Sequence, residues 1–126
     1  MAVGTAVLTQ NTNNAIRVFT WEWTAGTGAE AGTVSSSTTF PVYGQILALV
    51  TVPGTGGDAP DDNYDITVTD SLSGIDALWG AGANRDTADT EQIAPTSPSV
   101  CYGTLTLNVT NAGSANKGTA YVYVRG

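Results

Sequence analysis

The residues of this chain whose types could support chemistry are mainly carboxylates, and they are gathered in one segment. Nine of the eleven acidic residues lie between residues 58 and 91, and four of them fall within eight residues: Asp58, Asp61, Asp62 and Asp65. An oxygen-rich loop can bind Ca²⁺, which takes six to eight oxygen ligands. The spacing lacks the turn glycine and the closing glutamate of an EF-hand loop. A solvated acidic loop is therefore the preferred interpretation, and these four residues remain a weak calcium candidate.

Enzymatic chemistry has little support elsewhere in the sequence. The chain has no histidine, the commonest general base and the usual ligand of zinc, copper and nickel. The single cysteine, Cys101, has no histidine to activate it, and we expect a small buried apolar residue. Asp61 and Asp62 could act as paired carboxylates in glycoside hydrolysis, but adjacent loop carboxylates are solvated by default. We therefore predict no enzymatic activity, no catalytic residue and no cofactor.

Length and charge restrict the class of protein further. The chain has 126 residues, enough for one domain, and a formal net charge of −7. Such a charge argues against partners recognised through phosphates, so we expect neither nucleic acid nor a membrane surface as partner. The first residues, 1–4, carry no basic start or long apolar run typical of a signal peptide. We therefore expect synthesis and folding in a cytoplasm.

The elements that must position these residues are predicted to be strands, because turn residues recur between alternating segments. We expect residues 1–15 to contain an arm or edge strand, 33–39 a polar edge strand, and 42–52 a central strand with both faces covered. Further strands are expected at 16–23 and 64–69, and residues 103–125 are expected to form a hairpin. Residues 71–98 are predicted to be a long loop with at most one helical turn. The sequence thus predicts one antiparallel β-sandwich domain, jelly-roll-like or Ig-like, spanning residues 1–126.

The C-terminal strand carries the clearest alternation. Ala120, Val122 and Val124 share one face, and the other face carries Tyr121, Tyr123 and Arg125. Tyrosines and an arginine on the face away from the core indicate a contact surface. We therefore predict Tyr121, Tyr123 and Arg125 as partner-binding residues.

The tryptophans allow two interpretations each. Trp21 and Trp23 alternate with Phe19, and three aromatic residues on one face are expected to form core; a sugar-stacking platform is the alternative. Trp79 lies in the long loop, where we predict it, with Asn84 and Arg85, as a partner contact. The alternative for that loop is a packed crossover in which Trp79 closes one end of the sandwich.

Several segments of the chain resemble a known group of proteins. The segments Tyr64-Asp65-Ile66-Thr67-Val68-Thr69-Asp70 and Gly82-Ala83-Asn84-Arg85, and the ending from Gly103 to Arg125, resemble small virion proteins of tailed bacteriophages. The resemblance covers about half of the chain, mainly residues 64–125, and its motifs are structural. It implies a component of a phage particle, of the capsid decoration (cement) type. It assigns no binding residue.

Three functions remain open at this point. The first is a structural protein that decorates a phage capsid by multivalent contacts, located in the virion, with the major capsid protein or other virion proteins as partners and a dimer or trimer as its form. The second is a carbohydrate-binding module or host-surface adhesin that uses exposed aromatic residues. The third is a tail or neck component of the same particle.

Overall fold

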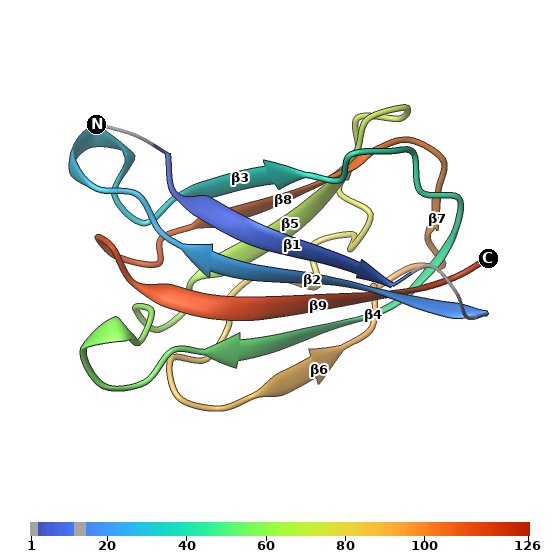
Figure 1. Cartoon of the computed structure of the whole chain (residues 1–126). Helices are drawn as coiled ribbons and strands as arrows, with labels where there is room; N and C mark the ends of the chain where they lie inside the picture. Colours follow the sequence, from blue (N-terminus) through green and yellow to red (C-terminus); the bar gives the residue numbers. More distant parts are fainter. Residues whose placement is uncertain (1–2, 12–14) are drawn as a thin grey trace.

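The computed structural model describes residues 3–11 and 15–126 and consists of two antiparallel sheets that pack as a sandwich (Figure 1). The larger sheet has the strand order β1–β2–β9–β4–β6, and β7 pairs with the beginning of β4. Its strands are β1 (Thr5–Asn11), β2 (Ile16–Thr24), β9 (Lys117–Arg125), β4 (Gly44–Pro53), β6 (Glu91–Ile93) and β7 (Val100–Cys101). The smaller sheet has the order β3–β8–β5, with bounds Val34–Ser37, Leu105–Thr110 and Asp65–Asp70. Short 3-10 turns, η1 (Gly28–Glu30) and η2 (Gly56–Asp58), lie in two loops. The prediction of an all-β sandwich is confirmed.

The core follows the alternation of the sequence. One face of β2 places Phe19, Trp21 and Trp23 in the interior, with at most 1% of each exposed, so the prediction that they are core is confirmed. The same holds for Ala120, Val122 and Val124 on β9, and for the inward residues of β5 and β8. Gly118 fits against the indole of Trp23, where an added Cβ would lie 2.4 Å from a ring carbon. The strands form because each pairs a β-branched or aromatic inner face with a polar or half-buried outer face.

Strand β4 differs from its prediction. Only one of its faces reaches the core, through Ile46, Leu49 and Thr51, whereas Leu47 and Val50 are half-buried. The pairing with β9 shifts between Ile46 and Ala48, which is a β-bulge. The bulge adds Leu47 to the strand, and the outer face carries Val50 and Val52, so the sequence has the near-continuous apolar run typical of a strand covered on both faces.

The predicted hairpin over residues 103–125 is wrong. Strand β8 pairs with β3 and β5, whereas β9 pairs with β2 and β4 in the other sheet. Residues 111–116 therefore cross between the sheets. Consecutive alternating strands do not reveal whether their connection stays in one sheet, because both arrangements bury the same face.

The long loop has more structure than predicted. It contains strand β6, which pairs with Leu49–Thr51 of β4 and was missed because its three residues are too few to show a period. Before β6, the chain runs along β5 and is joined to it by bridges at Thr69–Asp76 and Tyr64–Arg85. No α-helix forms in residues 3–11 and 15–126, and no helix in these ranges is long or apolar enough to cross a bilayer.

The N-terminal segment contains an edge strand, β1, one of the two predicted possibilities; its residues 12–14 lie outside the described part of the chain. Gly4 pairs with Val34 in parallel and thereby joins the two sheets along this side of the sandwich. An added Cβ at Gly4 would lie 2.1 Å from the carbonyl oxygen of Thr24, so the backbones can approach this closely only at glycine. Strand β3 also lies at an edge, as predicted.

Candidate binding surfaces

The two ends of the sandwich differ in chemistry. We call the end with β7 and the C-terminus, on the right in Figure 1, the aromatic end, and the opposite end the acidic end. Among the described residues, seven large apolar side chains are exposed at the aromatic end, between 37% for Phe40 and Ile75 and 76% for Val100. The seven are Ile16, Phe40, Tyr43, Leu72, Ile75, Val100 and Tyr102. Such a grouping marks an interaction surface more often than scattered apolar residues do.

Strand ends and loops hold the aromatic end together. The rings of Tyr43 and Tyr102 pack with centroids 4.5 Å apart at 59°, although 59 residues separate them in sequence. The backbone pairing of Gly44 with Cys101 brings their two segments side by side. The guanidinium of Arg17 donates a hydrogen bond to the backbone carbonyl oxygen of Tyr43 and thereby ties β2 to the segment before β4.

A buried carboxylate, Asp70, fixes two loops at this end. It is 3% exposed, and its Oδ1 accepts hydrogen bonds from the backbone N–H of Gly103 at 2.8 Å and of Leu72 at 3.2 Å. Its Oδ2 accepts one from the hydroxyl of Ser73 at 3.3 Å. The exposed residues Leu72 and Tyr102 therefore stand on a rigid base, which lowers the entropy cost of binding a partner.

At the acidic end, two carboxylates of the weak calcium candidate accept hydrogen bonds from neighbouring loops. Oδ1 of Asp65 accepts a hydrogen bond from the backbone N–H of Asn84 at 2.9 Å, and Oδ2 accepts one from the side-chain amide of Asn111 at 2.7 Å. Asp62 accepts one from the N–H of Thr87 at 3.2 Å. Within residues 3–11 and 15–126, no three carboxylate, thiol or imidazole side chains converge as metal ligands. Two of the four candidate ligands, Asp62 and Asp65, are therefore engaged in loop hydrogen bonds.

Asp86 illustrates the same use of a carboxylate. The backbone N–H groups of Ala88 and Asp89 both donate to its Oδ2, at 2.8 and 2.6 Å, and these bonds lower the pKa of Asp86 below its ordinary value. The carboxylate stays ionised because backbone donors stabilise its charged form.

The residues predicted as partner contacts in the long loop have different environments. Trp79 is 47% exposed and has a backbone φ of 53°, so it is accessible, and it does not close the end of the sandwich. Its neighbours Ala77 and Leu78 are buried instead. The guanidinium of Arg85 interacts with groups of its own chain. Its Nε and Nη2 donate to the carbonyl oxygen of Ala83, and its Nη1 lies 3.5 Å from the carboxylate of Glu91. Asn84 is exposed, and its left-handed φ of 59° places its N–H toward Asp65.

Tyr121 and Tyr123 lie on a different surface, the outer face of the larger sheet. Tyr121 is paired with Thr20 of β2 on one side and Val50 of β4 on the other, and Tyr123 lies between Val18 and Ala48. Both tyrosines are half-buried among these neighbours. The structure therefore does not bring all the predicted contact residues together: Trp79 and Asn84 lie beside β5, whereas the tyrosines and Arg125 lie on β9.

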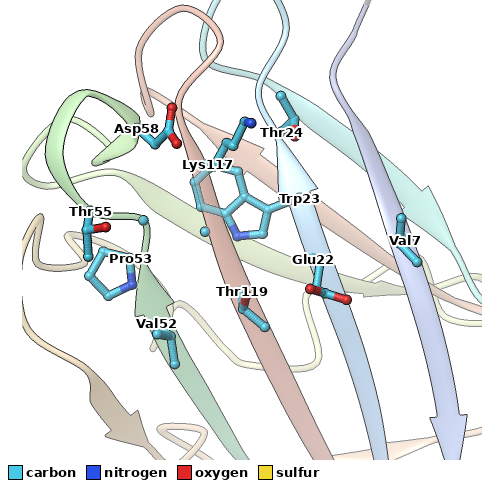
Figure 2. Close-up of a pocket in the computed structure, with 12 residues that line it drawn as sticks. Val7, Glu22, Trp23, Thr24, Val52, Pro53, Thr55, Asp58, Lys117 and Thr119 are labelled. Atoms are coloured by element: carbon cyan, nitrogen blue, oxygen red, sulfur yellow. The ribbon is translucent and has the colours of Figure 1, made fainter.

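A groove of about 460 Å³ crosses this outer face near the acidic end (Figure 2). Its walls carry Glu22 on β2, Val52 on β4 and the η2 residue Asp58, and Lys117 and Thr119 of β9 lie between them. Two carboxylates against one ammonium give the groove a negative balance.

Two buried groups complete the possible chemistry, and both are unreactive. Burial, together with the nearby negative charge of Asp70, raises the pKa of the Cys101 thiol to about 11, so little of this thiol is a nucleophilic thiolate at neutral pH. Burial also raises the pKa of Tyr64 to about 12, which the nearby Thr51 hydroxyl partly offsets. The two hydroxyls nevertheless make no hydrogen bond of acceptable geometry. Neither group can act as an acid or base near pH 7.

Sequence reasoning missed the aromatic end, because its residues are distributed over four separate segments. A signal was present: Phe40, Tyr43 and Tyr102 each stand beside a proline or glycine, where a large apolar residue in a turn is unusual. Comparison with family models, curated proteins and solved structures finds no match for this chain. Its function is therefore argued from these surfaces.

Proposed function

We propose that this chain is a non-enzymatic binding protein that attaches to a larger protein assembly through its aromatic end. The observation that carries the proposal is the concentration of exposed apolar side chains at one end of the sandwich, on loops that hydrogen bonds hold in place. Aromatic residues contribute a large contact area at low entropy cost, and they are enriched at protein interfaces.

We further propose that the assembly is the particle of a tailed bacteriophage and that the partner is its major capsid protein. The resemblance of residues 64–125 to small virion proteins supports this choice. A repeated lattice suits a small contact surface, because many modest contacts together retain the protein on the particle. A standard protein interface covers about 800 Å² per partner, an area that one end of a small sandwich can supply.

A second candidate is binding to a carbohydrate, which the exposed tyrosine pair favours. Tyr43 and Tyr102 are 49% and 64% exposed, and tyrosine rings can stack on sugar rings. A tail or neck protein would use the same surface on a different partner; copy number per particle separates it from a decoration protein, since decoration requires hundreds of copies.

The test is sedimentation of the purified chain with heads of the encoding phage that lack it. Replacing Tyr102→Ser should weaken binding by about tenfold, the effect of a contact residue worth more than 1 kcal/mol. Trp79→Ser is the matched control, an exposed aromatic residue away from this end, and should bind like the original chain. Equal binding of the Tyr102→Ser variant would reject the aromatic end as the attachment surface, and a glycan that quenches tryptophan fluorescence would favour the second candidate.

A further inference from the structure

The outer face of the larger sheet has the composition of a covered surface. Its middle carries uncharged side chains on three adjacent strands: Val18 and Thr20 of β2, Tyr121 and Tyr123 of β9, and Val50 and Val52 of β4. An antiparallel sheet that faces water on one side normally alternates apolar inner residues with strongly polar outer ones. Here the outer residues are valine, threonine and tyrosine, which pack well against another sheet.

The charge of this face has opposite signs at its two ends. Near the acidic end lies the groove, where the carboxylates of Glu22 and Asp58 outnumber the ammonium of Lys117 (Figure 2), and at the other end β9 finishes with the exposed Arg125. Among the described residues, the ion pair found is Arg85–Glu91, which lies elsewhere, so Glu22 and Arg125 remain available to a partner. A partner that matches this face places negative charge opposite Arg125 and positive charge opposite the groove. A second copy in the reverse strand direction has that arrangement.

We propose that two copies of this chain pack face to face through the outer surface of the larger sheet. The twofold axis lies between the facing larger sheets of the two copies and runs perpendicular to their strands. It passes over the position of Val122, the midpoint between Thr119 and Arg125 on β9. This axis places Arg125 of each copy opposite Thr119 of the other, at the groove that Glu22 and Asp58 line. Each copy thus provides the groove and the guanidinium that fills it, as a self-complementary twofold interface requires.

The face offers a modest area for a dimer. Strands β1, β2, β9 and β4 lie about 4.8 Å apart, and about seven residues of each, at about 3.3 Å per residue, cover roughly 450 Å² in projection. Protruding side chains raise the accessible area above this projection, so the contact lies below or near the ~800 Å² per partner of a standard interface. In such a dimer the two aromatic ends point in opposite directions, so the interface leaves the aromatic end of each copy free.

The experiment is sedimentation equilibrium of the full chain from about 1 to about 100 μM, with circular dichroism as the check on folding. The original chain should be dimeric, and Tyr121→Glu, at the centre of the face, should raise the dimer dissociation constant about thirtyfold or more. Ser35→Glu, on the exposed side of β3 in the other sheet, is the matched control and should leave the constant unchanged. A chain that stays monomeric throughout, or a dimer that Tyr121→Glu leaves intact, overturns the proposal.

Exchange of the charges tests the direction of packing. Glu22→Arg and Arg125→Glu should each weaken the dimer about tenfold, because each places like charges opposite one another, and the double variant should restore it. Failure of the double variant to recover overturns the proposed geometry. The Tyr102→Ser variant separates this inference from the proposed function, since it should lose binding to phage heads while remaining a dimer.

Discussion

The acidic end and the aromatic end use their side chains for opposite purposes. At the acidic end, Asp62, Asp65 and Asp86 accept hydrogen bonds from backbone N–H groups of neighbouring loops. Arg85 and Glu91 pair with one another across the same region. Toward the aromatic end, Asp70 does comparable work from a buried position, and the residues around it are exposed and apolar. Asp76, bridged to Thr69 beside it, likewise accepts hydrogen bonds from three backbone N–H groups.

The difference teaches where a functional signal lies in a chain of this kind. The dense carboxylates of residues 58–91 suggest a metal or a catalytic pair, yet most of those described hold loops in place. The exposed tyrosines and valine at the other end have no comparable structural task, and exposure of such residues costs solubility. Residues that stabilise nothing in the folded chain are the better guide to a partner.

The sharpest way to break this comparison is to remove one carboxylate from each end. Asp70→Ala should lower the free energy of unfolding by about 3 kcal/mol, because the N–H groups of Gly103 and Leu72 lose their acceptor in or near the core. Asp62→Ala should cost about 0.5 kcal/mol or less, because water replaces it at the N–H of Thr87. Urea unfolding at pH 7 measures both.

Equal effects of the two substitutions would mean that the carboxylates at the two ends have the same structural role. Asp70→Asn is a useful third variant. Its amide oxygen can still accept one backbone hydrogen bond, so its loss of stability should fall between those of the two alanine variants.

Much of the fold could be predicted because most strands keep a two-residue period. Trp21, Tyr64, Leu107 and Val122 lie on apolar faces that the sequence displays openly, and each is fully buried. The period fails where the backbone departs from a regular ladder, at the bulge beside Leu47 and in the three residues of β6. Pairing partners are a property of the whole sheet, which explains why β8 and β9 were wrongly joined as a hairpin.

The candidate surfaces could be predicted only in part. That Tyr121 and Tyr123 share one outer face could be predicted because a single strand carries both of them. Their role as binding residues stays a prediction. The contact between Tyr43 and Tyr102 requires β7 to pair with β4, and no local pattern indicates so short a strand. From the sequence Arg85 resembles a surface contact residue, but its side chain is only 13% exposed. It donates to the nearby carbonyl of Ala83 and pairs with Glu91, and the pair with Glu91 depends on how the loop folds back.

Alkaline pH tests the buried titratable group near each end, Tyr64 by the acidic end and Cys101 by the aromatic end. Burial raises their pKa values from 10.0 to about 12 and from 9.0 to about 11. The unfolded chain therefore loses these protons first, so stability is fully present below pH 9 and falls as the pH rises toward about 12. Cys101→Ala should reduce the early part of this loss and Tyr64→Phe the later part, as measured by urea midpoints between pH 8 and 11.5.

At pH 7 the Tyr64→Phe variant should unfold within about 0.5 kcal/mol of the original chain, because the buried hydroxyl has no hydrogen-bond partner among the described residues. An equally steep alkaline loss in the Phe variant would show that Tyr64 ionises normally in the folded chain. Cys101→Ala serves as the comparison, since its effect should begin about one pH unit lower.

The smallest expected effect concerns the ion pair at the acidic end and decides whether Arg85 is structural. Glu91→Gln keeps an oxygen for the N–H of Asp86 but removes the charge opposite Arg85, so it should lower stability by about 0.3–1 kcal/mol. This cost should shrink in about 0.5 M NaCl, because salt screens a partly exposed pair. Arg85→Gln should cost at least as much, since the two hydrogen bonds to Ala83 are lost as well. If Arg85→Gln leaves stability unchanged but weakens binding to phage heads, then Arg85 is a contact residue after all, and the acidic end shares the task assigned to the aromatic one.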